Sequence, residues 1–130
     1  MQIDAEPFQS HAITAYGPEG VTVNGQLHRG CLLLSSEGLL QPWQVNDANG
    51  SIAAEDLAAI LEHAAEQAAP YELLLLGTGR TAFFPPAPWI APFVRQGLPL
   101  EVMGTAAACR TYNIVAGEGR KVLAALWQPF

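Results

Sequence analysis

The segment from Glu72 to Leu76 reads ELLLL and stops at Gly77. A short continuous apolar run is typical of a strand buried on both faces, because a strand with one face in solvent alternates apolar and polar residues. We therefore expect a central strand here, in a sheet that has other elements packed on both of its faces.

Antiparallel strands are predicted for the first third of the chain, at His11–Gly17, Val21–Leu27, Gly30–Ser36 and Leu39–Val45. The Asn24-Gly25 pair is typical of two-residue hairpin turns, which need a positive φ at both positions. Pro42 cannot donate a backbone hydrogen bond, so we expect its strand at an edge of the sheet or at a bulge.

An amphipathic helix is predicted from Ala53 to Ala68. Apolar residues recur there with helical spacing, at Leu57, Ile60, Leu61, Ala64 and Ala68, and acidic residues occupy the other side. We expect Ser51 or a neighbour to cap its first turn. His63 lies on the same side of this helix as Asp56 and is expected to be exposed to solvent.

The second half of the chain alternates strands and helices. After the central strand we expect a short helix at Pro88–Gln96, although Pro92 interrupts it, then a strand at Leu98–Met103, a helix beginning near Thr105 and a strand at Lys121–Gln128. This order predicts an α/β fold: a three-layer single domain with a central mixed β-sheet, helices packed on it and an N-terminal antiparallel β-hairpin region. The domain spans residues 1–130, with residues 1–11 as a flexible N-terminus.

Length and charge limit the possible functions. A chain of 130 residues is long enough for one core. Its net charge is −6 and its six basic residues are scattered, which argues against binding nucleic acid. No apolar run approaches the roughly 20 residues of a transmembrane helix, and the N-terminus resembles neither a signal nor a transit peptide, so we expect a cytoplasmic protein. No structural disulfide is expected between Cys31 and Cys109, and we expect both to be buried thiols.

The segment Met103–Lys121, MGTAAACRTYNIVAGEGRK, concentrates reactive side chains among alanines and glycines. On a helix, Ala107, Ala108, Cys109, Tyr112, Ile114, Val115 and Ala116 form a wide apolar arc, which predicts close packing against another element. Thr105 is expected to cap this helix. Packing does not explain Arg110 or Asn113. Glu118 and Arg120 are expected either to form an ion pair, with Arg110 as a further member, or to contribute to a polar site.

The residues Gly77-Thr78-Gly79-Arg80-Thr81-Ala82 match the glycine-rich pattern of dinucleotide-binding folds. That pattern requires a helix to start inside it, and the sequence Phe83-Phe84-Pro85-Pro86 prevents one. Two interpretations remain. The segment is either a tight turn with positive φ at its glycines, or a turn whose N–H groups and Arg80 hold a small anion or ligand.

Metal and nucleophile sites are not supported. His11, His28 and His63 share no metal-ligand spacing with one another or with the cysteines, so no metal or other cofactor is predicted. A reactive Cys109 would need a base and an orienting group that the sequence does not indicate. The aromatic residues Phe83, Phe84 and Trp89 are expected to pack over the sheet or to form an exposed partner site.

The chain also resembles a known family. The residues that carry the resemblance are Gly77-Thr78-Gly79, the run Gly97–Met103, Thr105, the run Ala108–Asn113 and Glu118-Gly119-Arg120. They are similar to those of a small single-domain family of uncharacterised bacterial and archaeal proteins that includes the mitochondrial complex I assembly factor three. The resemblance extends from about Ile13 to Leu126. It implies a three-layer α/β fold and, for the mitochondrial relatives, a non-enzymatic role in binding another assembly factor and early membrane-enzyme subunits.

We therefore expect a non-catalytic protein-interaction module, with no catalytic residues, that assists assembly of a respiratory or other multi-subunit complex. Its partner would be another protein, and a homo-oligomer remains an alternative. The competing hypothesis is a small-molecule or anion-binding protein, or an enzyme, in which the glycine turn converges with Arg80, Arg110 and Asn113. The candidate ligand- or partner-binding residues are Gly77, Thr78, Gly79, Arg80, Thr105, Arg110, Asn113, Glu118 and Arg120.

Overall fold

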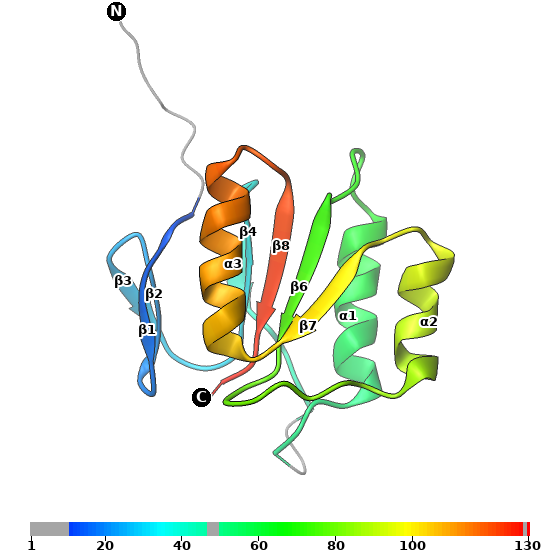
Figure 1. Ribbon diagram of the computed structural model, residues 1–130, viewed down its shortest axis with the longest axis horizontal. Helices are drawn as coiled ribbons and strands as arrows, with labels where there is room; N and C mark the ends of the chain where they lie inside the picture. The colour runs from blue at the N-terminus through cyan, green and yellow to red at the C-terminus, as the bar shows by residue number, and fades with distance from the viewer. Residues whose placement is uncertain (1–10, 47–49, 129) are drawn as a thin grey trace, which may run out of the picture.

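The computed structural model describes residues 11–46, 50–128 and 130, which form two sheets and three helices (Figure 1). The small antiparallel sheet contains β1 (Ile13–Gly17), β2 (Gly20–Val23) and β3 (Gln26–His28). The mixed sheet has the order β5-β4-β8-β6-β7, and its strands are β4 (Leu32–Ser35), β5 (Leu40–Pro42), β6 (Leu73–Gly77), β7 (Leu100–Met103) and β8 (Val122–Leu126). The helices are α1 (Ala54–Ala65), α2 (Ala87–Arg95) and α3 (Thr105–Gly117). Of the predicted flexible N-terminus, residues 1–10 lie outside the described residues.

The molecule has three layers, as predicted. Helices α1 and α2 cover one face of the mixed sheet, and α3 covers the other face beside the small sheet (Figure 1). Each face has its own apolar core. Leu75 and Tyr112 belong to the core on the α3 side, while Leu76 and Phe93 belong to the core on the α1 and α2 side. The assignment of residues 1–130 to one domain stays a prediction.

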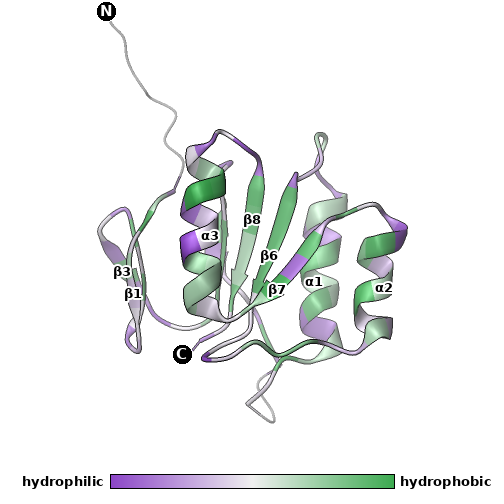
Figure 2. Cartoon of the chain, viewed as in Figure 1, coloured by the Kyte–Doolittle hydropathy of each residue, from purple (hydrophilic) through white to green (hydrophobic). Residues whose placement is uncertain are grey.

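Strands β6 and β8 form the buried centre of the mixed sheet. They run parallel, and every residue of both is buried, so the prediction of a covered strand at the ELLLL segment is confirmed. Figure 2 shows both strands in hydrophobic colours along their length. Ala124 and Ala125 in β8 are at most 1% exposed, and their small side chains leave room for the helices on either face.

The N-terminal strands follow the predicted turn chemistry. Asn24 and Gly25 have φ values of 50° and 84° and join β2 to β3 in a two-residue hairpin. Strand β5, which contains Pro42, lies at one edge of the mixed sheet. The prediction that Pro42 occupies an edge strand is therefore confirmed.

Helix α1 begins differently from the prediction. Ala53, rather than Ser51, is the N-cap residue, and its N–H donates to Asp56 Oδ2 at 2.8 Å. The other carboxylate oxygen accepts from the N–H of Asn46 at 2.7 Å. Asp56 at position N3 thus supplies the half of a capping box in which the N3 side chain accepts from the N-cap backbone, and its charge interacts favourably with the helix dipole. The helix ends at Ala65, before the predicted Ala68.

Helix α2 forms despite its two prolines. Pro88 lies in the first turn, where a missing N–H breaks no intrahelical bond, as predicted. Pro92 lies inside the helix, which still continues to Arg95. No helix among residues 11–46, 50–128 and 130 is long and apolar enough to cross a membrane.

Candidate functional site

The turn from Gly77 to Gly79 is held by the start of helix α3. Thr105 is fully buried, and its hydroxyl accepts from the N–H of Gly79 at 2.7 Å and donates to the carbonyl of Trp127 at 2.9 Å. The prediction that Thr105 caps α3 was wrong, because Gly104 is the N-cap and Thr105 is the first helical residue. Its side chain instead links Gly79, in the turn after β6, to Trp127, the residue that follows β8.

The backbone N–H groups of this turn are used within the protein. Thr78 donates its N–H to the carbonyl of Met103 at 2.9 Å, while Gly79 uses its own on Thr105. The Thr78 hydroxyl donates to the carbonyl of Thr81 at 2.7 Å and accepts from the N–H of Phe83. These donors are therefore already paired, which leaves the turn poorly suited to hold an anion.

The two glycines of the turn are required for different reasons. Gly79 has a φ of +102°, as predicted for a tight turn. Gly77 does not have a positive φ, so that part of the prediction was wrong. A Cβ atom at Gly77 would lie 2.9 Å from the Cα of Thr105 and 3.1 Å from the Cβ of Ala108, so the residue is needed for the close approach of α3 to β6.

Arg110 and Asn113 attach the small sheet to α3. The Asn113 side chain donates to the carbonyl of Ile13 at 2.7 Å and accepts from its N–H at 2.9 Å, as a neighbouring strand would. Arg110 donates to the hydroxyl of Tyr16 at 2.9 Å. Both side chains therefore contact β1, which explains why these two polar residues share one side of the helix.

Helix α3 ends at Gly117, and a glycine with a positive φ follows two residues later. Gly119 has a φ of +81°, its N–H donates to the carbonyl of Ala116, and the N–H of Arg120 donates to that of Val115, which together form a Schellman motif. The Arg120 side chain lies 3.8 Å from Glu118 and 3.3 Å from Glu72. The expected ion pair is therefore present, without Arg110. All three side chains are about half exposed, so the pairs add little to stability.

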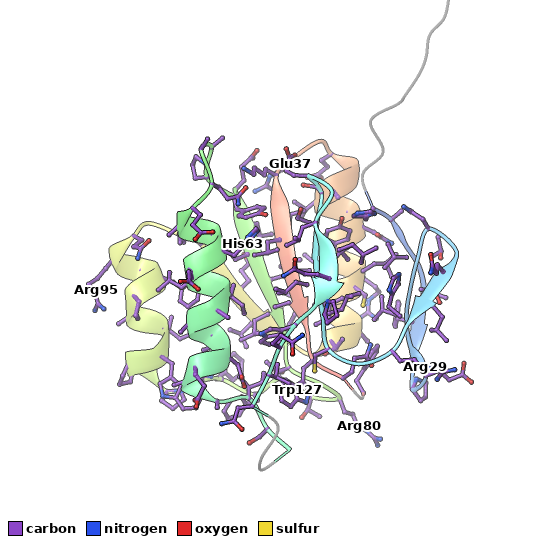
Figure 3. The ribbon with its side chains drawn as sticks, turned by 180° about the vertical axis from the view of Figure 1, so that it is seen from behind. Arg29, Glu37, His63, Arg80, Arg95 and Trp127 are labelled. Atoms are coloured by element: carbon purple, nitrogen blue, oxygen red, sulfur yellow. The ribbon has the colours of Figure 1, made fainter. Side chains whose placement is uncertain are left out.

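The predicted candidate residues occupy three separate places along α3. A helix of 13 residues is about 20 Å long. The glycine turn and Thr105 lie at its N-terminus, Arg110 and Asn113 lie along its middle, and Glu118 and Arg120 lie at its C-terminal end. Arg80 is exposed and extends away from the protein body (Figure 3).

The thiol of Cys109 is part of the core. Its side chain is 0% exposed and lies in the same apolar cluster as Ala108 and Tyr112. Burial raises the pKa of Cys109 to about 12, and the neighbouring Arg110 charge offsets this only in part. The thiolate form that acts as a nucleophile is therefore strongly disfavoured at neutral pH.

Cys109 should resist alkylation in the folded protein. At pH 8 its thiolate fraction is on the order of 0.01% for a pKa of about 12, and the reagent cannot reach a fully buried sulfur. We expect iodoacetamide to leave Cys109 unmodified in the native protein and to modify it completely in concentrated denaturant, as read by peptide mass spectrometry. Equal modification rates in the two states would contradict this assignment.

His63 and His11 lie within hydrogen-bonding distance of groups inside the protein. His63 was predicted to be exposed, but it is half-buried and its Nε2 lies 2.9 Å from the hydroxyl of Tyr71. Burial, the largest cause, lowers the pKa of His63 and favours its neutral form. The Nε2 atom of His11 lies 2.9 Å from the carbonyl oxygen of Gly38. In the described part of the chain, no three His, Cys, Asp or Glu residues are grouped so that they could hold a metal ion.

An apolar surface covers the outer side of α2. Phe84 and Val94 are 72% and 71% exposed. A shallow groove of about 510 Å³ runs beside Val94, and it is lined by Pro85, Ala87, Ile90, Ala91, Val94 and Arg95. We call these lining residues together with Phe84 the α2 surface. Figure 2 shows hydrophobic residues along α2.

Sequence reasoning identified only part of the α2 surface. It selected the aromatic residues Phe83, Phe84 and Trp89, of which the two phenylalanines are exposed and Trp89 is partly buried against the core. It missed Ile90 and Val94, which lie four residues apart and therefore on the same side of the helix. That spacing was visible in the sequence, but Pro92 between them had made the helix uncertain.

Comparison with known proteins places the chain in a recognised group. The family described as "Protein of unknown function (DUF498/DUF598)" matches residues 13–127. An uncharacterised protein of Rhodobacter capsulatus is 36% identical over 114 residues, which cover 88% of this chain and 82% of that protein.

A second relative is named as an assembly factor, and a third has a known structure. The NADH dehydrogenase [ubiquinone] 1 alpha subcomplex assembly factor 3 of Danio rerio is 32% identical over 119 residues, which cover 90% of this chain but only 64% of that protein. A crystal structure of a Bordetella parapertussis protein superposes with a TM-score of 0.77 at 32% identity and covers 93% of this chain and 98% of that one.

Proposed function

The chain belongs to the DUF498/DUF598 family of proteins of unknown function, and we propose that it is a non-catalytic protein-interaction module that docks a partner protein on the α2 surface. Its role would be to assist assembly of a respiratory or other multi-subunit complex. The zebrafish relative, which is named as an assembly factor, supports this class of function. The observation that carries the proposal is the exposed apolar surface of α2.

The α2 surface has the properties of a docking site. Phe84 and Val94 are the most exposed of the large apolar side chains in the described residues. Burying such side chains against a partner stabilises a complex by about 25 cal/mol per Å² of apolar area, before the costs of association are subtracted. Arg95 borders the groove and extends outward (Figure 3), so an acidic group on the partner would find a counter-charge there.

The chemistry of the remaining polar groups supports a role without catalysis. The Cys109 thiol is buried with a raised pKa, and the Thr105 hydroxyl is fully engaged by Gly79 and Trp127. The alternative of a small-molecule site at Gly77-Gly79, Arg80, Arg110 and Asn113 has less support. The turn uses its own N–H groups internally, and Arg110 and Asn113 both contact β1. The buried Cys109 thiol forms no disulfide, which agrees with a reducing compartment, and we propose a cytoplasmic location.

The test compares two exposed apolar positions on opposite faces of the protein. The tagged chain is expressed at native level in its own cell, and captured proteins are identified by mass spectrometry. We expect Val94→Glu to abolish capture of the reproducible partner, because the substitution places a carboxylate in the apolar groove. The matched control is Ile114→Glu on α3, where Ile114 is 63% exposed and lies far from α2, and it should retain the partner.

Thermal unfolding of both variants excludes a general loss of folding as the cause. Both positions are exposed, so each substitution should change the free energy of unfolding by no more than about 0.5 kcal/mol. Recovery of the same partners by Val94→Glu would contradict docking on the α2 surface. Failure to recover any partner with the unmodified chain would contradict the proposed function itself.

A further inference from the structure

Strand β7 forms an edge of the mixed sheet next to the α2 surface. In the order β5-β4-β8-β6-β7 it pairs only with β6, and no other strand of the described residues lies on its outer side. In Figure 1, α2 lies beyond β7 on the side away from β6. We propose that this edge pairs with an extended segment of the partner protein whose sequence alternates apolar, basic, apolar. The inference rests on the proposed interaction function and specifies how the partner binds.

The backbone of β7 presents two residues to a new strand. The carbonyls of Pro99 and Met103 accept from the N–H groups of Leu74 and Thr78, so the odd-numbered residues face β6. Backbone groups alternate in direction along a strand, and Leu100 and Val102 therefore direct their N–H and carbonyl groups away from β6. An unpaired edge of this kind is a template for an added strand.

Neighbouring elements limit the pairing to these two residues. On one side, the N–H of Leu98 already donates to the carbonyl of Phe93 at 2.9 Å. On the other, the carbonyl of Gly104 accepts from Ala108 in α3, and a Cβ at Gly104 would meet the backbone of the loop at Gly79 and Arg80 at 3.4 Å. A bound segment consequently uses Leu100 and Val102 as its hydrogen-bonding partners.

The charge of Glu101 argues against a second copy of this chain. A symmetric antiparallel pair that uses Leu100 and Val102 of both copies places Glu101 directly opposite its equivalent. Like charges in directly opposed positions destabilise a strand pair. Glu101 is exposed and forms no ion pair with any residue that the structure describes. A Lys or Arg of a different protein in that position gives the favourable pairing instead.

The two faces of β7 set the rest of the pattern. Leu100 and Val102 are partly buried against the core on the α1 and α2 side, while Glu101 points to the opposite face. Residues of an added strand that lie beside Leu100 and Val102 would therefore extend toward α2 and should be apolar. The residue between them lies beside Glu101 and should be basic. The bound segment would thus continue from the sheet edge toward the α2 surface.

The opposite edge of the sheet shows how such pairing is usually prevented. Strand β5 has three residues and includes Pro42, which has no N–H to donate. It also lies close to β3, because Leu27 and His28 line the same surface pocket as Gln41 and Pro42. Strand β7 has no proline within its bounds, so it is the edge suited to a partner.

A peptide selection on the full chain tests the proposal without knowledge of the natural partner. A random 12-residue peptide library displayed on phage is the probe, and bound sequences are read after several rounds. We expect enrichment of segments with the apolar–Lys/Arg–apolar pattern. On the Glu101→Lys variant the same selection should enrich Asp or Glu at the central position. The proposal would be overturned if the unmodified chain selected no apolar–basic–apolar sequences, or if Glu101→Lys did not change the central residue from basic to acidic.

Backbone pairing is tested with the enriched peptides. Val102→Pro removes an N–H that points away from β6 and should weaken the Kd about tenfold or more. The control Val102→Thr keeps that N–H and the β-branched shape, so its Kd should stay within about threefold. Equal Kd values for the unmodified chain, Val102→Pro and Val102→Thr would overturn strand pairing. If Val102→Pro does not fold, an unchanged peptide preference of Glu101→Lys would overturn it instead.

Different results contradict the two proposals, docking on the α2 surface and strand pairing at β7. If Val94→Glu loses the cellular partner while Val102→Pro and Glu101→Lys retain it, docking on the α2 surface stands and pairing with β7 is wrong. If no cellular partner is captured, the interaction function is wrong, and the peptide selection still decides whether the β7 edge accepts a strand.

Discussion

Tyr112→Ala should lower the free energy of unfolding by about 3–5 kcal/mol, the range for removing a large buried aromatic side chain. Tyr112 is 0% exposed and is among the largest fully buried side chains of the protein. It lies in the core on the α3 side of the mixed sheet. Its hydroxyl also donates to the carbonyl of His11 at 2.7 Å, so the substitution removes both a core contact and an attachment of the N-terminal segment. Urea unfolding followed by circular dichroism measures the loss.

The conservative variant Tyr112→Phe separates these two contributions. It keeps the ring and removes only the hydrogen bond, so we expect a loss of about 1 kcal/mol. A loss of similar size in both variants would show that the ring contributes little and would contradict the packing described for α3.

Gly77→Val should cost about 1–3 kcal/mol, and more if the backbone cannot move apart. The first atom of any side chain at this position would lie 2.9 Å from the Cα of Thr105, which belongs to the backbone and cannot rotate away. The substitution therefore pushes α3 away from β6 and strains the hydrogen bond between Thr105 and Gly79. The shift in the urea midpoint reports the effect.

Gly17 offers a matched control for this steric argument. It also lies in a strand without a positive φ, but a Cβ at Gly17 meets nothing within 4 Å. Gly17→Ala should be neutral or stabilising by a few tenths of a kcal/mol, because alanine restricts the unfolded chain. Gly77→Ala should destabilise in the same assay. Equal effects at the two positions would mean that the close contact with α3 is not what requires Gly77.

Much of the fold could be predicted because local chemistry determines it. The Asn24-Gly25 pair indicated a hairpin turn and the leucine run indicated a covered strand, and both predictions are confirmed. These signals depend on backbone geometry or on solvent exposure, and short runs of residues adjacent in sequence are enough to indicate both. The predicted boundaries of strands and helices differ by a few residues because tertiary contacts set the last hydrogen bonds.

The roles of polar residues could not be predicted because their partners are distant in sequence. Thr105 contacts Trp127 and Asn113 contacts Ile13, so the hydroxyl and the amide acquire their functions only when the layers assemble. Ile114 shows the same limit for an apolar residue. Its helical position predicted burial, but it is 63% exposed because the wide apolar arc of α3 exceeds what the sheets cover. Part of the α2 surface was not predicted for a local reason: Pro92 argued against a continuous helix, so the shared side of Ile90 and Val94 was not recognised.

The attachment of β1 to α3 has a dynamic consequence. The small sheet shares no backbone ladder with the mixed sheet in the described residues, and its hydrogen bonds to α3 come from the side chains of Arg110 and Asn113, while Tyr112 bonds to His11 just before β1. Local opening can therefore release β1–β3 as one cooperative unit while the strands of the mixed sheet remain paired. Amide protons of Thr22 and Val23 should then exchange with solvent through a lower-energy opening than those of Leu74 and Leu123. Opening of the N-terminal sheet would therefore expose the core around Tyr112 without unfolding the mixed sheet.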